Sequence, residues 1–410
     1  MVPNGWNTKP LADIVKEKIS YGIVQAGPHV PDGIPYIKSS DVRGTINPDA
    51  LQRTSQEIHF KYRRSSVHPG DIVFSLRGNI GESAIVPASL PEANLTQGTA
   101  RISVSVEHSN LFHYYQLASE KILNRVNALS KGSTFKEISL EELRKVKVLC
   151  APLPEQKKIA QILSAWDKAI TTTEQLLANS QQQKKALMQQ LLTGKKRLLD
   201  ENGVRFSGDW NALNLGEILS KVSNGVTYDA KNVEGLPVTR IETISTGKVN
   251  FNKVGFAPDE ENTRRFKLHQ GDILYSHINS LEHIGRVAYF NDARPLYHGM
   301  NLLLLRTGEK HDSLYIYYLL GSELGKKYAK SYAKSAVNQA SISTTDVKAF
   351  RFLIPNLPEQ QKIAAVLSAA DQEISALQQK LDALKQEKKA LMQQLLTGKR
   401  RVKIEEVGNA

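Results

Sequence analysis

Apolar residues in two segments of this chain recur at alternating steps of three and four. In residues 357–401 they fall at Leu367, Ala370, Ile374, Leu377, Leu381, Leu384, Leu391 and Leu395, with Lys388 in the gap. In residues 153–197 the same register gives Leu163, Trp166, Ile170, Leu177, Leu187 and Leu191, interrupted by Thr173, Ser180 and Lys184. This heptad spacing predicts two long helices that pair with each other as a coiled coil.

The ends of both segments carry helix signals. Pro154 and Pro358 stand in the first turn, where a missing N–H costs nothing, and a glutamate that suits the helix dipole follows each. Gly194 and Gly398, with lysine and arginine beside them, mark the far ends. About 40 residues at ~1.5 Å each predict helices roughly 60 Å long.

The two segments are copies of one another. They align without a gap at an offset of 204, and 28 of 45 positions are identical. Weaker matches precede them: Trp6 with Trp210, Gly70-Asp71-Ile72 with Gly271-Asp272-Ile273, and Tyr114-Tyr115 with Tyr317-Tyr318. A repeat this long indicates a tandem duplication of whole domains. The shared residues are typical of a framework, and the differing ones of two tasks on one scaffold.

The blocks 1–152 and 198–356 mix short strand-like runs with helical stretches. Runs such as 34–37, 71–75, 102–104, 271–275 and 302–305 are bounded by Gly, Pro, Asn and Asp, and residues 110–128 and 312–332 carry Tyr and Leu at helical spacing. We therefore expect an α+β fold with pseudo-two-fold symmetry. Its parts are two mixed α/β domains (1–152 and 198–356), two antiparallel helical segments between them (153–197 and 357–401), and a tail (402–410).

Composition narrows the function. The net charge of +13 suggests a polyanionic partner, although charge alone is equally compatible with a basic surface that has no such role, and the two helical segments are the most basic for their length. A single cysteine, Cys150, excludes an internal disulfide and a multi-cysteine zinc module. No apolar run approaches the ~18 residues of a membrane span, and the N-terminus does not resemble a signal peptide, so we expect a cytoplasmic protein without a membrane partner.

Catalytic motifs are not found in the sequence. It has no GxxxxGK[ST] loop, no GxGxxG turn after a strand, and no Asn-Pro-Pro-aromatic run. Glu155-x-Lys157 has the spacing of a nuclease metal site but lacks an upstream aspartate, and the His277–His283 spacing fits no common helical ligand pair. We therefore predict a binding protein rather than an enzyme, with no metal site.

Polar and basic clusters recur at comparable places in both blocks. Arg and Lys can pair with guanine, Asn and Gln with adenine, and Ser and Thr with phosphates or either base. We predict that these clusters bind DNA through Lys38, Ser39, Ser40, Arg43, Arg63, Arg64, Arg77, Asn79, Lys131, Ser133, Thr134 and Lys136 in the first block, and Arg240, Thr243, Arg264, Arg265, His277, Asn279, Ser280, Lys334, Asn338 and Gln339 in the second.

Two divergent domains, each followed by a near-identical helix opening Leu-Pro-Glu-Gln, resemble the specificity subunit of a Type I restriction-modification system. The resemblance covers essentially the whole chain, and its sharpest motifs are Leu-Pro-Glu-Gln at 153–156 and 357–360, the repeated Leu-Met-Gln-Gln-Leu-Leu-Thr-Gly-Lys, and Gly-Asp-Ile followed by a short loop. The first block has Lys131-Gly132-Ser133-Thr134, close to the family's Gly-Ser/Thr turn, whereas the second has Ser335-Ala336-Val337-Asn338.

The resemblance implies two target-recognition domains, each reading half of a split site in double-stranded DNA, and a helix pair that sets the gap. It also implies two methyltransferase subunits docked on this scaffold and two motor-endonuclease (restriction) subunits. S-adenosylmethionine, ATP and Mg²⁺ would then belong to those partners, and this chain would need no cofactor. Because the two readers differ, the site should be asymmetric, unlike the palindrome of a two-fold dimer.

Two alternatives stay open at this stage. The chain could be the recognition subunit of another bipartite modification or defence system, which genomic neighbours would reveal. It could also be a coiled-coil scaffold that binds only proteins, although such a scaffold needs no divergent polar loops. A stand-alone nuclease or methyltransferase ranks third, because the sequence offers no motif for either.

Overall fold

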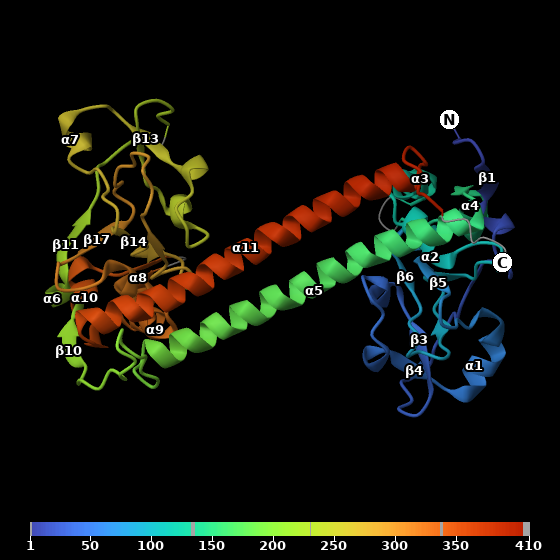
Figure 1. Ribbon diagram of the computed structural model, residues 1–410, viewed down its shortest axis with the longest axis horizontal. Coiled ribbons are helices and arrows are strands. Elements are labelled where there is room, and N and C mark those ends of the chain that lie inside the picture. The colour runs from blue at the N-terminus through green and yellow to red at the C-terminus, as the bar shows by residue number, and fades with distance from the viewer. Residues whose placement is uncertain (1, 133–135, 230, 337–338, 405–410) are drawn as a thin grey trace. The chain divides into compact units, whose positions relative to one another are not determined.

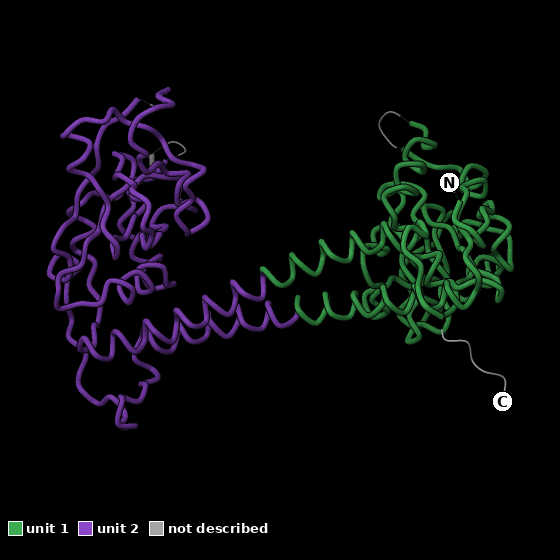
Figure 2. The backbone as a smooth tube through the Cα atoms, turned by 45° about the horizontal axis from the view of Figure 1, so that its top comes forward, with its two compact units in different colours: residues 1–174, 379–410 green, residues 175–378 purple. Residues whose placement is uncertain are grey.

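The computed structural model describes residues 2–132, 136–229, 231–336 and 339–404, which form two compact units. Unit 1 comprises residues 1–174 and 379–410, and unit 2 comprises residues 175–378 (Figure 2). Each unit therefore combines one α/β domain with one half of each long helix.

Two helices of 39 residues each, α5 (Leu153–Leu191) and α11 (Leu357–Leu395), confirm the predicted long helices (Figure 1). At 1.5 Å per residue each is about 58 Å long. Both end before a glycine in the left-handed region, Gly194 with φ +70° and Gly398 with φ +66°. A Cβ on Gly194 would lie 3.4 Å from the Trp210 ring, so a glycine also fits the close approach of that ring.

The described residues of unit 1 form three small sheets. A four-stranded antiparallel sheet has the order β2-β8-β5-β6 and a three-stranded sheet the order β4-β3-β7. A third pair, β1-β9, joins the chain start to the strand that leads into α5. The strands are β1 (Asn7–Pro10), β2 (Ser20–Tyr21), β3 (Ile34–Ile37), β4 (Gln52–Thr54), β5 (Ile72–Ser75), β6 (Ser83–Ile85), β7 (Asn94–Leu95), β8 (Thr99–Ile102) and β9 (Lys147–Cys150).

Unit 2 repeats the main sheets of unit 1. Its four-stranded sheet has the order β11-β17-β14-β16, and the pair β10-β20 leads into α11, while β12-β13 and β15-β19-β18 are smaller sheets. The strands are β10 (Asn211–Asn214), β11 (Leu219–Asn224), β12 (Leu236–Val238), β13 (Gly255–Ala257), β14 (Ile273–Tyr275), β15 (Ile278–Asn279), β16 (Val287–Tyr289), β17 (Leu303–Thr307), β18 (Lys334–Ala336), β19 (Gln339–Ser341) and β20 (Arg351–Ile354).

The remaining helices are short. In unit 1 they are α1 (Gln56–Tyr62), α2 (Asn110–Leu117), α3 (Glu120–Leu129) and α4 (Leu140–Lys145), and in unit 2 they are α6 (Leu215–Ile218), α7 (Glu261–Arg264), α8 (Ser313–Gly321), α9 (Glu323–Tyr332) and α10 (Thr344–Lys348). The helices expected over 110–128 and 312–332 are thus each broken in two. Serines at the breaks explain the difference, because Ser119 and Ser322 donate their hydroxyls to carbonyls three residues back and so end the first helix.

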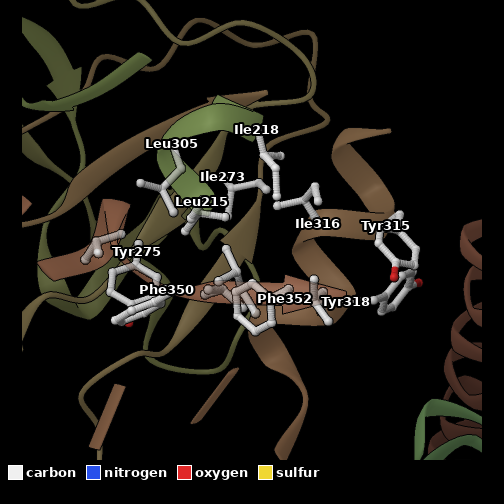
Figure 3. Packing of buried hydrophobic residues seen from close by; sticks show 14 of the residues in the cluster. Leu215, Ile218, Ile273, Tyr275, Leu305, Tyr315, Ile316, Tyr318, Phe350 and Phe352 are labelled. Atoms are coloured by element: carbon white, nitrogen blue, oxygen red, sulfur yellow. The ribbon is translucent and has the colours of Figure 1, made fainter. Parts of the chain in front are cut away.

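Apolar residues from the sheets, the tyrosine-bearing helices and the long helices share one core in unit 2. Tyr275 on β14, Tyr315 on α8 and Phe350 are fully buried there (Figure 3). Leu191 of α5 and Leu367 of α11 belong to the same cluster. In unit 1 the corresponding cluster joins Phe112 and Tyr115 of α2 to residues of α5 and α11. The long helices are therefore part of each domain's core.

The residues predicted to pair the helices lie on the sheltered side of α5 and α11. All of them are buried or half-buried: Leu163, Trp166, Ile170, Leu177, Leu187 and Leu191 on α5, and Leu367, Ile374, Leu377, Leu381, Leu384, Leu391 and Leu395 on α11. We call these heptad positions, together with the polar residues that interrupt them, the seam of the helix pair. Two polar seam residues of α5, Thr173 and Ser180, are buried as well. Thr173 donates its hydroxyl to the Ala169 carbonyl at 2.8 Å, and Ser180 donates to Glu373 of α11 at 3.2 Å.

The Leu-Pro-Glu-Gln motif anchors each helix start. In unit 1 the carboxylate of Glu155, 1% exposed, accepts two hydrogen bonds from Arg401 and one from the Trp6 indole at 3.0 Å. In unit 2 Glu359 is held in the same way by Arg197, at 2.6 and 2.7 Å. An arginine that follows one long helix therefore closes over the beginning of the other.

The glutamine of the motif binds the helix that carries the tyrosine pair. Gln156 Oε1 accepts from the backbone N–H of Ser109, the N-cap of α2, at 2.8 Å. Gln360 Oε1 accepts from the N–H of Asp312, the N-cap of α8, at 2.9 Å. The motif thus fixes the domain to the helix in both units, which explains why its residues repeat when the domain surfaces do not.

Candidate nucleic-acid interface

A loop and a hairpin meet beside the central sheet of each unit. In unit 1 the loop after β5 pairs with Glu137 through the Arg77–Glu137 backbone bridge, and Glu137 is also bridged to Lys131. In unit 2 the corresponding pairs join Ile278 of β15 and Lys334 of β18 to Ser341 of β19. The same construction carries different side chains in the two units.

Three of the predicted clusters come together around this loop in unit 1. Arg43 donates to the Asn79 side-chain carbonyl at 2.6 Å, and Asn79 donates to the Ser39 carbonyl at 3.4 Å. Arg77 is joined to Glu137 at 3.0 Å. Lys38, Ser40, Lys131 and Lys136 stand at the exposed or half-exposed edge of the same region. The arrangement offers guanidinium, amide and ammonium donors on one surface.

Two of the predicted clusters come together in unit 2. The three-stranded sheet β15-β19-β18 places Asn279, Lys334 and Gln339 on neighbouring strands, and Lys334 and Gln339 are exposed. Asn279 donates to the Ser276 hydroxyl at 3.1 Å, and Ser280 is exposed at the end of β15. Arg240 lies at the start of another loop, where its guanidinium is 3.4 Å from Glu242.

Four predicted arginines lie on other elements. Arg63 and Arg64 are exposed just after α1, where Arg63 stacks 4.0 Å from the centre of the exposed Phe60 ring. Arg264 binds Asp259 through two hydrogen bonds and Arg265 binds Glu261, on and beside α7. No hydrogen bond between the described residues joins these arginines to the loop-and-hairpin surface.

Two predicted residues are buried. Thr243 is fully buried, donating its hydroxyl to the Lys253 carbonyl at 2.6 Å and accepting from the Arg240 N–H at 2.8 Å. His277 is 7% exposed, and burial lowers its pKa to about 4, so the ring is neutral at pH 7. Ser133, Thr134 and Asn338 lie outside the described residues. The sequence did not predict that the Thr243 hydroxyl bonds to nearby backbone groups, because a loop threonine that caps the backbone has the same sequence signature as one that binds DNA.

His108, His113 and Cys150 form a group in unit 1 that the sequence did not reveal; His113 and Cys150 are buried and His108 is half-buried. Their ligand-type atoms lie within 4.8 Å of one another, and burial lowers the pKa of His113 to about 3. However, the Lys9 ammonium lies 3.5 Å from His108 Nε2, and the amide of Gln156 lies 3.2 Å from His108 Nδ1. Because both ring nitrogens of His108 already have a partner, one of them a cation, we interpret the group as packing between the domain and α5 and not as a metal site.

Each unit also has a basic pocket between its domain and one of the long helices, α11 in unit 1 and α5 in unit 2. The pocket of unit 1, about 650 Å³, and that of unit 2, about 850 Å³, are lined by matching residues at the end of α11 and α5, respectively, and just after each helix. The matched pairs are Lys388 with Lys184, Lys389 with Lys185, Met392 with Met188, Gln393 with Gln189, Leu396 with Leu192, Thr397 with Thr193 and Lys399 with Lys195. The repeated helices thus present two copies of one surface.

Comparison with known proteins agrees with this architecture. The family model described as the Type I restriction modification DNA specificity domain matches residues 3–179 and 207–386. The chain is 24% identical to the Type I restriction enzyme MjaVIII specificity subunit of Methanocaldococcus jannaschii over 417 residues, covering 98% of this chain and 94% of that protein. It is 43% identical over 195 residues to the putative MjaX specificity subunit of the same organism, over 46% of each chain.

A solved structure shares the fold. The crystal structure of the Type I restriction-modification S subunit from M. genitalium superposes with a TM-score of 0.62 at 16% identity, covering 96% of this chain and 97% of that one. Among the helices that the structure describes, none is both long enough and apolar enough to cross a membrane.

Proposed function

Because this chain belongs to the family of Type I restriction modification DNA specificity proteins, we propose that units 1 and 2 each read one half of a bipartite, asymmetric DNA site. The chain is a non-catalytic specificity subunit with two target recognition domains. We assign the domains to residues 1–152 and 198–356, joined by the helical segments 153–197 and 357–401.

One observation supports the proposal above all. The loop-and-hairpin construction recurs in both units, but its side chains differ, with Arg43, Arg77 and Asn79 in unit 1 against Asn279, Lys334 and Gln339 in unit 2. Direct readout needs donors and acceptors that vary on a constant frame, because each base pair shows its own pattern in the major groove. Two different readers on one frame predict two different half-sites.

The long helices are proposed to set the gap between the half-sites. A continuous helix transmits a fixed distance, whereas a flexible linker would allow a distribution of gaps. At ~3.4 Å per base pair, a helix of about 58 Å spans up to roughly 17 base pairs.

The two basic pockets are the proposed docking sites for two methyltransferase subunits. Their shared lysines, methionine and leucine suit an amphipathic segment with acidic residues. Two restriction subunits would complete the complex, and S-adenosylmethionine, ATP and Mg²⁺ would be bound by these partners.

The experiment is methylation mapping. The chain is expressed with its neighbouring methyltransferase gene in a host without DNA methylation, and the DNA is sequenced for N6-methyladenine. We expect a split asymmetric motif with a fixed gap. Exchanging residues 1–152 for those of a related chain should change one half of the motif, and exchanging residues 198–356 should change only the other.

Two results would contradict the proposal. If a soluble complex forms without any new methylation, the modification role fails, and a protein-binding scaffold becomes the better explanation. If either exchange alters both halves of the motif, the assignment of one half-site to each unit is wrong.

A further inference from the structure

A lysine interrupts the apolar seam of the long helices in unit 2, and it is bound there by a carboxylate. Lys184 of α5 donates to Asp371 of α11 at 2.6 Å, and its side chain is only 20% exposed. Asp371 also accepts a hydrogen bond from Tyr318 of α8 at 2.7 Å. The Lys184 ammonium lies 5.3 Å from the centre of the Tyr318 ring. A seam lysine, a flanking aspartate and a domain tyrosine thus form one closed cluster.

Unit 1 contains the same cluster with the helices exchanged. Lys388 of α11 forms an ion pair with Asp167 of α5, and its side chain is 19% exposed. Tyr115 of α2 donates to Asp167 at 2.6 Å, and the Lys388 ammonium again lies 5.3 Å from the tyrosine ring centre. We call the two clusters polar locks: Lys184–Asp371–Tyr318 in unit 2 and Lys388–Asp167–Tyr115 in unit 1.

One antiparallel register satisfies both polar locks. Asp167 and Lys184 are 17 residues apart along α5, and Asp371 and Lys388 are 17 residues apart along α11. The order of acid and base lets each ion pair form when the helices run in opposite directions. A parallel alignment that matched these positions would set aspartate against aspartate and lysine against lysine.

A slip of one heptad would break both locks. Asp167 would face Leu381 or Leu395, and Lys184 would face Ala364 or Gln378. A partly buried charge without its ion-pair partner is unfavourable. The leucine positions of the seam, by contrast, tolerate a slip of seven residues, because apolar side chains then pack against other apolar side chains. The apolar seam therefore favours pairing, and the charged positions discriminate between registers.

We propose that the two polar locks select the single register of α5 on α11. Given the function proposed above, they act as positioning residues for DNA recognition, because the register fixes how far apart the two readers are held. Each lock also ties the register to a domain, since Tyr115 and Tyr318 belong to the domain helices α2 and α8.

The test measures the register directly in the full chain. Glu174 and Lys385 face each other across the helices at 2.7 Å, so cysteines at both positions report the native register. Cysteines at Glu174 and Gln378 report a slip of one heptad in one direction, and cysteines at Glu174 and Met392 report a slip of one heptad in the other. Cys150 is replaced by isoleucine, the residue at the equivalent position Ile354 of unit 2, and a bis-maleimide joins the introduced pair.

With both lysines present, we expect either slipped pair to cross-link at less than about a tenth of the native yield. The Lys184→Met and Lys388→Met double variant removes both charges but keeps helix propensity and the apolar stem. Its slipped yield should rise at least about fivefold. The matched control replaces the exposed helix lysines Lys158 and Lys362 by methionine and should change nothing.

A slipped yield that stays at the starting level in the double variant would overturn the proposal, because the register would then be held elsewhere. An equal rise in the control would overturn it as well. A second measurement serves if the double variant does not fold: Lys388→Asp alone should raise the slipped yield, and adding Asp167→Lys should restore the original value.

The two proposals fail separately. Cross-linking requires neither DNA nor a partner, so it tests the polar locks even if methylation mapping fails. If both hold, methylated DNA from cells with the lysine-to-methionine double variant should contain sites with more than one gap length. The control variant should retain the single gap.

Discussion

Glu155 and Arg401, 246 residues apart in the chain, form a two-point ion pair at 2.6 and 2.8 Å. The Glu155 side chain is 1% exposed, and the Arg401 side chain is 46% exposed. Arg401 also donates to the Asn4 carbonyl at 2.8 Å. This joint brings the segment after α11 to the first residues of the chain and holds the first turn of α5 inside unit 1.

Loss of the arginine should destabilise unit 2, where Arg197 binds Glu359, more than unit 1, where Arg401 binds Glu155. Glu359 is 1% exposed and its carboxylate is held by Arg197, whereas Glu155 also receives the Trp6 indole. Arg197→Ala leaves a buried carboxylate without its partner and should cost about 3 kcal/mol of unit 2 stability. Arg401→Ala should cost unit 1 less, because Arg401 is half exposed and Trp6 remains.

Urea titration followed by hydrogen exchange in α8 and α2 measures the two losses. Arg400→Ala, at an exposed neighbouring position, is the control. A larger loss for Arg401→Ala than for Arg197→Ala would show that the indole hydrogen bond does not compensate.

Acid should weaken unit 1 through His113. Burial and the nearby His108 and Lys9 lower the pKa of His113 from 6.5 to about 3. Below pH 6.5 the unfolded chain therefore binds a proton at His113, whereas the folded chain does not bind it until the pH approaches 3. The contribution of His113 to the free energy of unfolding is therefore fully present above pH 6.5 and is lost as the pH drops toward 3, with a loss of up to about 2 kcal/mol at pH 5. His113→Ile, which copies Ile316 of unit 2, should flatten this slope.

The check is the difference in free energy of unfolding between His113→Ile and wild type, measured at several pH values. His277 and His298 of unit 2, whose pKa values burial lowers to about 4, remain in both proteins and cancel in the difference. A difference that does not change between pH 5 and 7 would contradict the prediction.

Two substitutions in unit 1 should separate base reading from backbone binding. Arg43 is oriented by Asn79, so Arg43→Ala should relax one half of the recognised motif and cost about 1–3 kcal/mol of specific binding. Lys131 is exposed on the hairpin, and Lys131→Ala should weaken binding to all sequences and reduce the salt slope by about one. Titrations of site and off-site DNA at several salt concentrations distinguish these outcomes. Equal effects of Arg43→Ala on both DNAs would assign Arg43 to the backbone.

The paired pockets predict a stepwise loss of partner subunits. Met392→Glu in unit 1 or Met188→Glu in unit 2 places a carboxylate in a half-buried, lysine-lined pocket that should receive an acidic segment. Each single variant should bind one methyltransferase subunit fewer, and the double variant should bind none, because like charges then face each other. Mass photometry of the purified complexes counts the subunits. An unchanged mass for the double variant would place docking elsewhere.

The sequence predicted the helices and the duplication well, because a 39-residue amphipathic pattern and a gapless repeat are strong signals. It also marked the seam interruption at Lys388, but it could not supply the reason, since Asp167 is 221 residues away. The candidate interface was harder to predict. Nothing in the one-dimensional pattern distinguishes Thr243, whose hydroxyl is used internally, from Ser280 at an exposed strand end. The pairing of Arg77 with Glu137, and of Glu137 with Lys131, rests on isolated bridges too short to leave a periodic signal.

Unit 1 is built from two separate stretches of the chain, and this has a consequence for biosynthesis. Unit 2 occupies the uninterrupted stretch 175–378, so all of its parts leave the ribosome together. Unit 1 needs residues 379–410 as well as residues 1–174. The domain translated first therefore waits for the last part of the polypeptide before Lys388 and Arg401 can reach Asp167 and Glu155. The order of completion is the reverse of the order of synthesis, and a message truncated before residue 379 would leave unit 2 whole and unit 1 open.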